Sequence, residues 1–272
     1  MNYTDEQLYN LHNVEKEILT EVITLCEENN LAYFVDWGTL LGTVRHQGFI
    51  PWDDDVDISM PRNDYNTFLE IATKKLRPGY VLQHFSTDPL TPQYCAKVRK
   101  DGTKFVEEYA INLPIHQGVF IDIYPIDNLP NDTKISRKYQ RKATILKQLF
   151  IAKVVRQPSY HKKAIKKILL SCVRKVIAFI IVGIPRQYIF RQLDRHLQQY
   201  NSIQCEKVSC IGTSRGEHFR EDIYPLETSR FEDLIVRVPH NQKQILEDEY
   251  GDFLILPPKE ERFGHCPALF QV

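Results

Sequence analysis

Four aspartates occur in the stretch WDDDVDIS, which covers residues 52–59. Asp55 and Asp57 alternate with the apolar residues Val56 and Ile58, and this alternation predicts a β-strand with one buried face. The two carboxylates would lie together on the other face, where they repel each other unless a cation lies between them. Mg²⁺, or Mn²⁺ in its place, is the expected cation, because both prefer oxygen ligands.

Two other interpretations of the aspartates have to be weighed. Acidic runs are usually solvated surface turns, but such a turn does not need apolar residues in alternation with the acids. An EF-hand calcium loop requires Gly at its sixth position and Glu at its twelfth, and counting from Asp53 these positions hold Ile58 and Asp64. We therefore predict that Asp55 and Asp57 bind a metal ion.

A further acid and two small residues add to this pattern. Asp122 lies in the stretch GVFIDIYPID, again within apolar alternation. A carboxylate buried in such a strand is costly unless it has a partner charge or a metal. Gly38 and Thr39 predict a small-residue turn that opens a short helix over Leu40–His46.

Three basic residues are candidates for phosphate contacts. Lys97 and Arg99 stand two residues apart and therefore share one face of a predicted strand. They would either contact a diphosphate or form a solvated pair at an exposed edge. Arg45 lies between the small-residue turn and the aspartates, so it would be adjacent to phosphate or form a structural ion pair.

The elements that must position these residues follow from capping and periodicity. Thr4 and Gln7 have the spacing of a capping box, and an apolar stripe then continues to about Glu28. The other predicted helices are 64–76 and 241–250, with basic helical sequence from 131 to about 200. The predicted strands are 32–35, 80–85, 94–99, 104–109, 118–124 and 234–238.

Composition limits the class of protein. The 272 residues include 35 basic and 35 acidic side chains, so the overall charge does not favour a nucleic-acid partner. The six cysteines are scattered without metal-ligand spacing, which is typical of reduced thiols in the cytoplasm. The polar N-terminus does not resemble a signal peptide, and no apolar run approaches the roughly 18–20 residues of a spanning helix. There is no GxxxxGK[ST] or GxGxxG motif.

One segment is strongly basic. Residues 134–186 contain 15 Lys and Arg and no Asp or Glu. Its apolar runs, 168–170 and 176–184, are interrupted by Arg174 and Lys175, which favours a helix lying in a headgroup layer over one that crosses it. We expect docking on an anionic membrane surface, at the inner face of the membrane. The alternative is that the apolar residues pack on the catalytic domain and the cations are solvated or bind an anionic acceptor.

The motifs resemble those of a known family. A Gly-Thr turn, an Asp-x-Asp strand and a later strand with one more Asp are similar to polymerase-β-type nucleotidyltransferases. The stretches GTLLGTVRHQGFIPWDDDVDISM, YCAKVRKDGT, GVFIDIYPID and YGDFLILPP resemble the LicD family of phosphocholine transferases. The resemblance implies an α+β fold in which helices flank a nucleotidyltransferase-like mixed β-sheet. We expect a catalytic core over 1–130, a basic helical insert over 131–200 and a C-terminal part, 201–272, that completes the catalytic domain.

The resemblance also implies an activity. Family members transfer a phosphoalcohol, typically phosphocholine from CDP-choline, to a sugar hydroxyl of a surface glycan, teichoic acid precursor or lipopolysaccharide. Asp55, Asp57 and Asp122 would then hold the metal, with Asp53 as a ligand or orienting group. Asp122 is the first candidate for the general base. Phosphate contacts would come from Gly38, Thr39, Arg45, Lys97 and Arg99.

Other functions remain open at this point. A nucleotidyltransferase would use the same metal logic but would release pyrophosphate. A non-catalytic membrane-associated scaffold would have no reason to retain the clustered acids. A choline ligand would favour an aromatic cage, and several aromatic residues lie near the motifs, but the sequence does not assign one. It also assigns no catalytic role to His46, His116 or His265.

Overall fold

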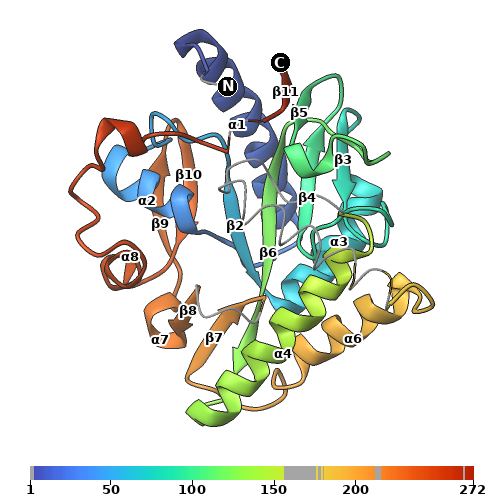
Figure 1. Ribbon diagram of the computed structural model, residues 1–272. Coiled ribbons are helices and arrows are strands. Elements are labelled where there is room, and N and C mark those ends of the chain that lie inside the picture. The colour runs from blue at the N-terminus through green and yellow to red at the C-terminus, as the bar shows by residue number, and fades with distance from the viewer. Residues whose placement is uncertain (1–2, 156–175, 177–178, 180, 212–215, 266) are drawn as a thin grey trace.

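A seven-stranded mixed sheet forms the centre of the protein, with helices packed around it (Figure 1). The computed structural model describes residues 3–155, 176, 179, 181–211, 216–265 and 267–272. The main path of the sheet has the order β1-β2-β6-β4-β3. Its strands are β1 (Phe34–Val35), β2 (Asp57–Pro61), β6 (Phe120–Leu129), β4 (Ala96–Lys100) and β3 (Tyr80–Gln83).

Strand β6 is the longest strand of the sheet and joins its two parts. Its first half pairs with β4, and its second half pairs with β7 (Lys207–Cys210), which in turn pairs with β8 (Glu217–Phe219). The pairing of β2 with β6 is parallel, and the other strand pairs of the sheet are antiparallel. A parallel pair needs a long crossover, and helix α3 with strands β3 and β4 lies in the chain between β2 and β6.

The first helix, α1 (Asp5–Glu28), begins as the sequence predicts. Thr4 and Gln7 form the reciprocal hydrogen bonds of a capping box. The apolar stripe of α1, including Leu11, Ile18 and Val22, is completely buried, and the helix contacts β4 and β6. Helix α3 (Arg62–Lys75) contacts α1 and the sheet. These two helices therefore cover the sheet with the residues expected from periodicity.

The remaining helices surround the other parts of the sheet. Helices α4 (Thr133–Ala152) and α6 (Arg186–Gln198) pack against each other, and α6 contacts β6. Helix α2 (Trp37–His46) contacts β2 and α8 (Gln242–Tyr250). The short elements are α7 (Arg220–Ile223), η1 (Glu108–Ala110) and η2 (Lys259–Glu261). Among the described residues, no helix combines the length and apolar character needed to cross a membrane.

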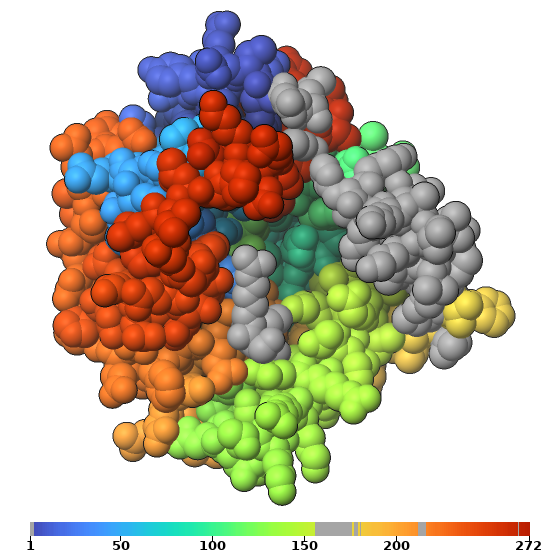
Figure 2. Space-filling view, turned by 60° about the vertical axis from the view of Figure 1, so that its left-hand side comes forward, coloured from blue at the N-terminus to red at the C-terminus, as the bar shows by residue number. Residues whose placement is uncertain are grey.

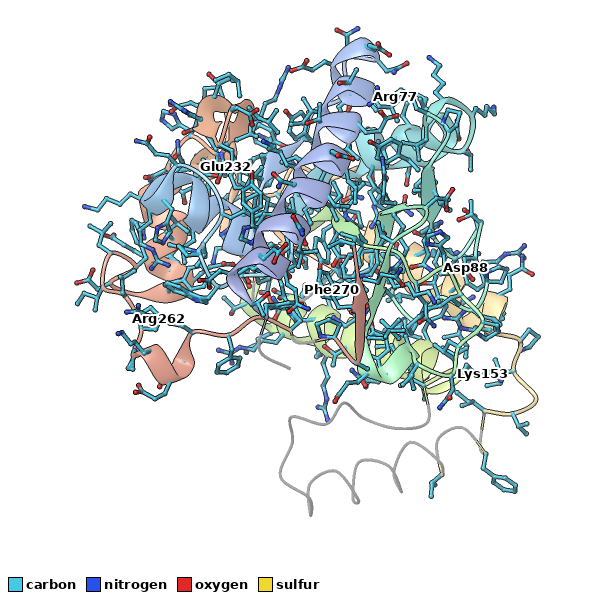
Figure 3. All side chains as sticks on the ribbon, turned by 90° about the horizontal axis from the view of Figure 1, so that it is seen from above. Arg77, Asp88, Lys153, Glu232, Arg262 and Phe270 are labelled. Carbon is cyan, nitrogen blue, oxygen red and sulfur yellow. The ribbon has the colours of Figure 1, made fainter. Side chains whose placement is uncertain are left out.

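Within the described part of the chain, two strand pairs lie outside the main sheet. Strands β9 (Glu227–Phe231) and β10 (Leu234–Val238) form a hairpin. Strand β5 (Lys104–Val106) pairs with β11 (Leu269–Gln271) near the end of the chain. Phe270 of β11, labelled in Figure 3, makes edge contacts with the rings of Tyr3 and Phe105. The C-terminal segment is thereby attached to the N-terminal one.

Several boundaries differ from the sequence predictions. The strand expected over 104–109 ends at Val106. It lies outside the main sheet and pairs with β11, a segment from a distant part of the chain. Gly38 and Thr39 do not form a turn before the helix but lie in its first turn. Strands β7, β8, β9 and β11 have too few alternating residues to be recognised locally. The α+β class with a mixed sheet is confirmed, and β7 and β8, from the C-terminal part, belong to the same sheet as β6.

Candidate active site

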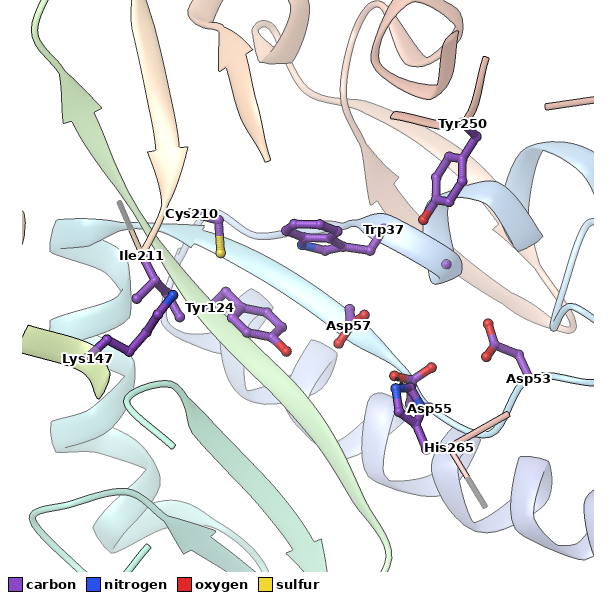
Figure 4. A pocket seen from close by; sticks show the side chains of 11 residues that line it. Trp37, Asp53, Asp55, Asp57, Tyr124, Lys147, Cys210, Ile211, Tyr250 and His265 are labelled. Atoms are coloured by element: carbon purple, nitrogen blue, oxygen red, sulfur yellow. Dashed lines mark ion pairs between the residues drawn. The ribbon is translucent and has the colours of Figure 1, made fainter. Parts of the chain in front are cut away.

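A pocket of about 500 Å³ opens beside β2 and β6 and collects side chains from distant parts of the chain (Figure 4). The molecule is hollowed on this face, between the C-terminal segment, in red, and α4, in yellow-green (Figure 2). The sequence-predicted residues that line the pocket are Gly38, Asp53, Asp55 and Asp57. The other lining residues are Trp37, Tyr124, Lys147, Cys210, Ile211, Tyr250 and His265.

The two halves of the predicted metal site meet across β2 and β6. Asp57 and Asp122 are partners in the parallel register of these strands, so their side chains share one face of the sheet. Val56 and Ile58 are completely buried on the opposite face, as the alternation predicts. The fold therefore brings Asp55, Asp57 and Asp122 together.

Backbone contacts connect α2 to this acidic strand. The N–H group of Asp57 donates a hydrogen bond to Thr39 Oγ1 at 2.8 Å. The N–H group of Asp36 donates to the carbonyl of Asp57 at 3.1 Å. A Cβ atom at Gly38 would lie 2.8 Å from Asp53 Oδ2, so the absence of a side chain there leaves room for the carboxylate. The two small residues thus support the acids directly.

The carboxylates are poorly solvated and repel one another. Burial, together with the charges of Asp55 and Asp54, raises the pKa of Asp53 to about 8. Burial is also the largest cause of the raised pKa values of Asp55 and Asp57, and the neighbouring charge of Asp122 adds to both. Asp57 Oδ1 is buried and has no hydrogen-bond partner among the described residues. A divalent cation fits this donor set, because it would relieve the repulsion and use the orphaned oxygen.

A neighbouring cluster was not assigned from the sequence. Asp54 is buried and accepts hydrogen bonds from the Tyr3 hydroxyl at 2.7 Å and from the His265 N–H group at 2.6 Å. His265 Nδ1 lies 3.1 Å from Asp54 Oδ1 and 3.5 Å from Asp55 Oδ2. The hydrogen bond to Asp54 raises the pKa of His265. Asp54 thus joins both ends of the chain to the aspartate strand.

This cluster also offers ligand atoms. Asp54, Asp55 and His265 have potential ligand atoms within 4.8 Å of one another. A Cβ atom at Gly264 would come within 2.3 Å of Asp54, so only glycine lets the C-terminal segment approach this closely. No local sequence pattern predicts the contact, because His265 and Asp54 are 211 residues apart in the chain.

The predicted phosphate-binding cations occupy three different environments. Lys97 is buried, and its Nζ atom lies 3.0 Å from Asp122 Oδ2 and 3.7 Å from Glu107. Arg99 is buried beside it and donates hydrogen bonds to Gln83 Oε1 and to the Gly118 carbonyl, each at 2.6 Å. Neither side chain is solvated, so the alternative of an exposed cationic edge is wrong.

Arg45 and Lys147 complete the set of basic residues. Arg45 donates a hydrogen bond to the Phe253 carbonyl at 2.8 Å and does not line the pocket. Lys147, on α4, lines the pocket and has no ion pair with another described residue. Burial lowers the pKa of Lys147. The pocket therefore contains a lysine that the motifs did not single out.

The chain is similar to proteins of one family. Residues 30–153 match the family described as "LicD/FKTN/FKRP, nucleotidyltransferase domain". Over 264 residues, 91% of each chain, it is 26% identical to the lipopolysaccharide cholinephosphotransferase LicD of Haemophilus influenzae. It is also 36% identical over 102 residues to an uncharacterized protein of Rickettsia typhi, covering 36% of this chain and 31% of that protein. A similar uncharacterized protein of Rickettsia prowazekii is 34% identical over 102 residues, which is 36% of each chain.

Proposed function

The chain belongs to the LicD family and is a phosphotransferase, and we propose that it transfers phosphocholine from CDP-choline to a sugar hydroxyl of a surface glycan. The observation that carries the proposal is the register of Asp57 with Asp122, at the edge of a pocket that Asp53, Asp55 and Asp57 line. This arrangement occurs in a chain that aligns over 91% of its length with a cholinephosphotransferase. The acceptor class is a lipopolysaccharide or teichoic acid precursor.

The acids are the residues that would hold a divalent metal. Asp55, Asp57 and Asp122 are the proposed ligands, and Asp53 ligates or orients them. A bound Mg²⁺ or Mn²⁺ would neutralise charge on the donor phosphates. The chain itself holds the carboxylates in place through the Thr39 and Asp36 contacts with the Asp57 backbone.

The remaining donor contacts follow from the lining of the pocket. Lys147 is partly desolvated and has no acidic partner among the described residues, so an anionic ligand would complete its interactions. We assign Lys147 to the donor phosphates. Lys97 and Arg99 support the site indirectly, since their charged groups are already engaged. Lys97 positions Asp122, and Arg99 is hydrogen-bonded to Gln83 and Gly118 next to it.

The reaction exchanges one P–O bond for another. The acceptor hydroxyl oxygen forms a bond to the choline-bearing phosphorus, and the bond from that phosphorus to the bridging oxygen breaks. CMP leaves with the bonding electrons, and the acceptor proton passes to a carboxylate, for which we propose Asp122. In-line positioning and charge neutralisation are the main requirements of such a transfer.

A nucleotidyltransferase is the second candidate, favoured by the description of the matching domain. The two activities break different phosphate bonds, so their products distinguish them. We expect CMP to appear in step with acceptor modification when the protein is incubated with CDP-choline, Mg²⁺ and a sugar acceptor. Pyrophosphate released from CTP in step with acceptor modification would overturn the phosphocholine assignment. Asp55→Asn is the inactive control in both assays.

We also propose that the protein works in the cytoplasm, docked on the inner face of the membrane. Phe179 and Val182, next to α6, have 81% and 73% of their surface exposed. In contrast, Ile181 is buried against Phe150 and Ile189, so part of the insert packs on the body. Lys153, labelled in Figure 3 at the end of α4, donates hydrogen bonds to the carbonyls of Ile181 and Val182. The run 168–170 and the lysines at 162, 163, 166 and 167 lie outside the described residues.

A further inference from the structure

We propose that Trp37, with Tyr124 and Tyr250, forms an aromatic wall that binds the quaternary ammonium group of choline. The inference rests on the proposed function and adds the group that selects the alcohol. All three side chains line the same pocket as Asp53, Asp55 and Asp57. In Figure 4 the indole of Trp37 lies between Cys210 and Tyr250, with Tyr124 and Asp57 below it.

The backbone of Trp37 is held in an unfavourable conformation. Its φ angle is 51°, in the left-handed region that bulky side chains rarely adopt. Asp36 Oδ1 accepts a hydrogen bond from the Trp37 N–H group at 2.9 Å, and Asp36 Oδ2 accepts one from Ser59 Oγ at 2.6 Å. Strain of this kind persists only where the surroundings enforce it, and it concentrates at functional sites. Here it fixes the position of the indole at the pocket.

The indole of Trp37 packs closely against the backbone of Gly216. A Cβ atom at Gly216 would lie 2.7 Å from Trp37 Cζ2 and 3.0 Å from Cη2. A residue with a side chain would therefore displace the ring. Gly216 itself has a φ angle of 75°, which also favours glycine. Two independent features of the chain, the strained Trp37 and the glycine against its ring, thus hold the indole in one place.

The length of the substrate points to the ammonium as the group bound here. In phosphocholine only an ethylene bridge separates the phosphate ester oxygen from the quaternary nitrogen. The nitrogen must therefore lie next to the reacting phosphate, in the pocket of the acids. Trp37 meets this requirement, because the preceding residue, Asp36, is hydrogen-bonded to the Asp57 backbone. The cytosine of CDP-choline is farther away, beyond the ribose and the second phosphate.

The charge and chemistry of the wall agree with a cationic ligand. A quaternary ammonium cannot donate hydrogen bonds and is recognised by the faces of Trp and Tyr rings. The second tryptophan of the chain, Trp52, is placed differently, since Arg262 lies 4.9 Å and Arg45 6.0 Å from its ring centroid. Trp52 is therefore a matched control.

The first experiment compares donors. We expect Trp37→Leu to raise KM for CDP-choline about tenfold, as the loss of a desolvated cation–π contact predicts. The KM for CDP-ethanolamine, whose ammonium can donate hydrogen bonds elsewhere, should change less than about twofold. Trp37→Phe should lie between wild type and Trp37→Leu, and Trp52→Leu should leave the ratio of the two KM values unchanged. The inference is overturned if Trp37→Leu raises the KM for both donors equally and also weakens the binding of CMP. That result would show that the indole stacks on the cytosine.

The second experiment measures binding without turnover. In a Trp52→Phe variant Trp37 is the sole tryptophan, so its fluorescence reports on the wall. Saturable quenching by CDP-choline that choline competes away, and ethanolamine does not, supports the inference. Equal competition by both amines, or quenching unaffected by choline, overturns it. If the protein binds choline in this way but transfers nothing to any acceptor, the proposed function fails while the ammonium site stands.

Discussion

Asp57 and Asp122 are register partners on two parallel strands that are distant in the chain. Neighbouring strands are about 4.8 Å apart, so two carboxylates on the same face at the same register must lie close together. Lys97, on the other neighbour of β6, contacts Asp122 from its opposite side. The pair is therefore held between a buried cation and the pocket, which is where a metal and a phosphate would bind.

Removing one of these charges should separate activity from stability. We expect Asp57→Asn to lower kcat by about a hundredfold or more, because a charge needed in the transition state is lost. Without metal, the same variant should melt about 2–4 °C higher than wild type, because repulsion among buried carboxylates is relieved. Calorimetry in the presence of a chelator, together with initial rates in Mg²⁺, measures both effects. Asp252→Asn, at an exposed acid, is the control. Near-wild-type activity of Asp57→Asn would contradict the metal site.

Lys147, which has no acidic partner among the residues that the structure describes, should contribute to donor affinity. We expect Lys147→Met to weaken CMP and CDP-choline binding about tenfold, the usual effect of losing a hydrogen bond to a charged group. Lys147→Arg should restore most of the affinity, since it keeps the charge. Titration calorimetry of each variant gives the dissociation constants. Lys142→Met, on an exposed position of the same helix, should have no effect. If both methionine variants weaken binding equally, Lys147 acts only through the overall charge of α4.

A buried histidine should make stability depend on pH. His84 is 6% exposed, and burial lowers its pKa to about 4, whereas an unfolded chain binds this proton near 6.5. Between these values the unfolded state therefore binds more protons than the folded state. The contribution of His84 to the free energy of unfolding is fully present above pH 6.5. It is lost as the pH falls to 4, and the total loss is about 3 kcal/mol.

Urea unfolding at several pH values tests this dependence. The free energy of unfolding of His84→Gln should vary less between pH 6.5 and 4 than that of wild type. Parallel curves for wild type and His84→Gln would show that other groups cause the dependence.

The exposed apolar residues next to α6 should bind membranes together with the basic segment. We expect the protein to sediment with vesicles rich in anionic lipid at low salt, and binding should fall steeply as salt is added. The double variant with Phe179→Asp and Val182→Asp should bind the vesicles less. A variant in which Lys162, Lys163, Lys166 and Lys167 are replaced by Glu should also bind them less. Ile235→Asp, at a hairpin residue that is 62% exposed, is a matched control. A wild-type protein that stays in the supernatant at low salt would exclude membrane docking.

Much of the fold could be predicted because its signals are local. The capping box of Thr4 and Gln7 and the stripe of α1 are contained within one helix, and both are confirmed. The alternation around Asp55 and Asp57 identifies the buried face of the strand in the same way. The family resemblance of the long motif is confirmed by the match over residues 30–153.

The pairing of distant segments could not be read in this way. Lys97 and Arg99 do share a strand face, but only the sheet shows that this face is buried against Asp122 and Gln83. Strand β5 can be recognised as a strand from its composition, but it pairs with β11 and not with the main sheet. Pairing depends on which segment of the chain lies beside the strand in the folded protein. Local periodicity contains no information about that partner.

The sequence by itself determined the types and spacing of the acids and the faces they occupy. The tertiary structure decided what surrounds them: Asp122 in register with Asp57, Lys147 and Trp37 at the pocket, and His265 against Asp54. The physical reason is that alternation and capping act between residues a few positions apart, whereas register, burial and charge pairing depend on the packing of the whole chain.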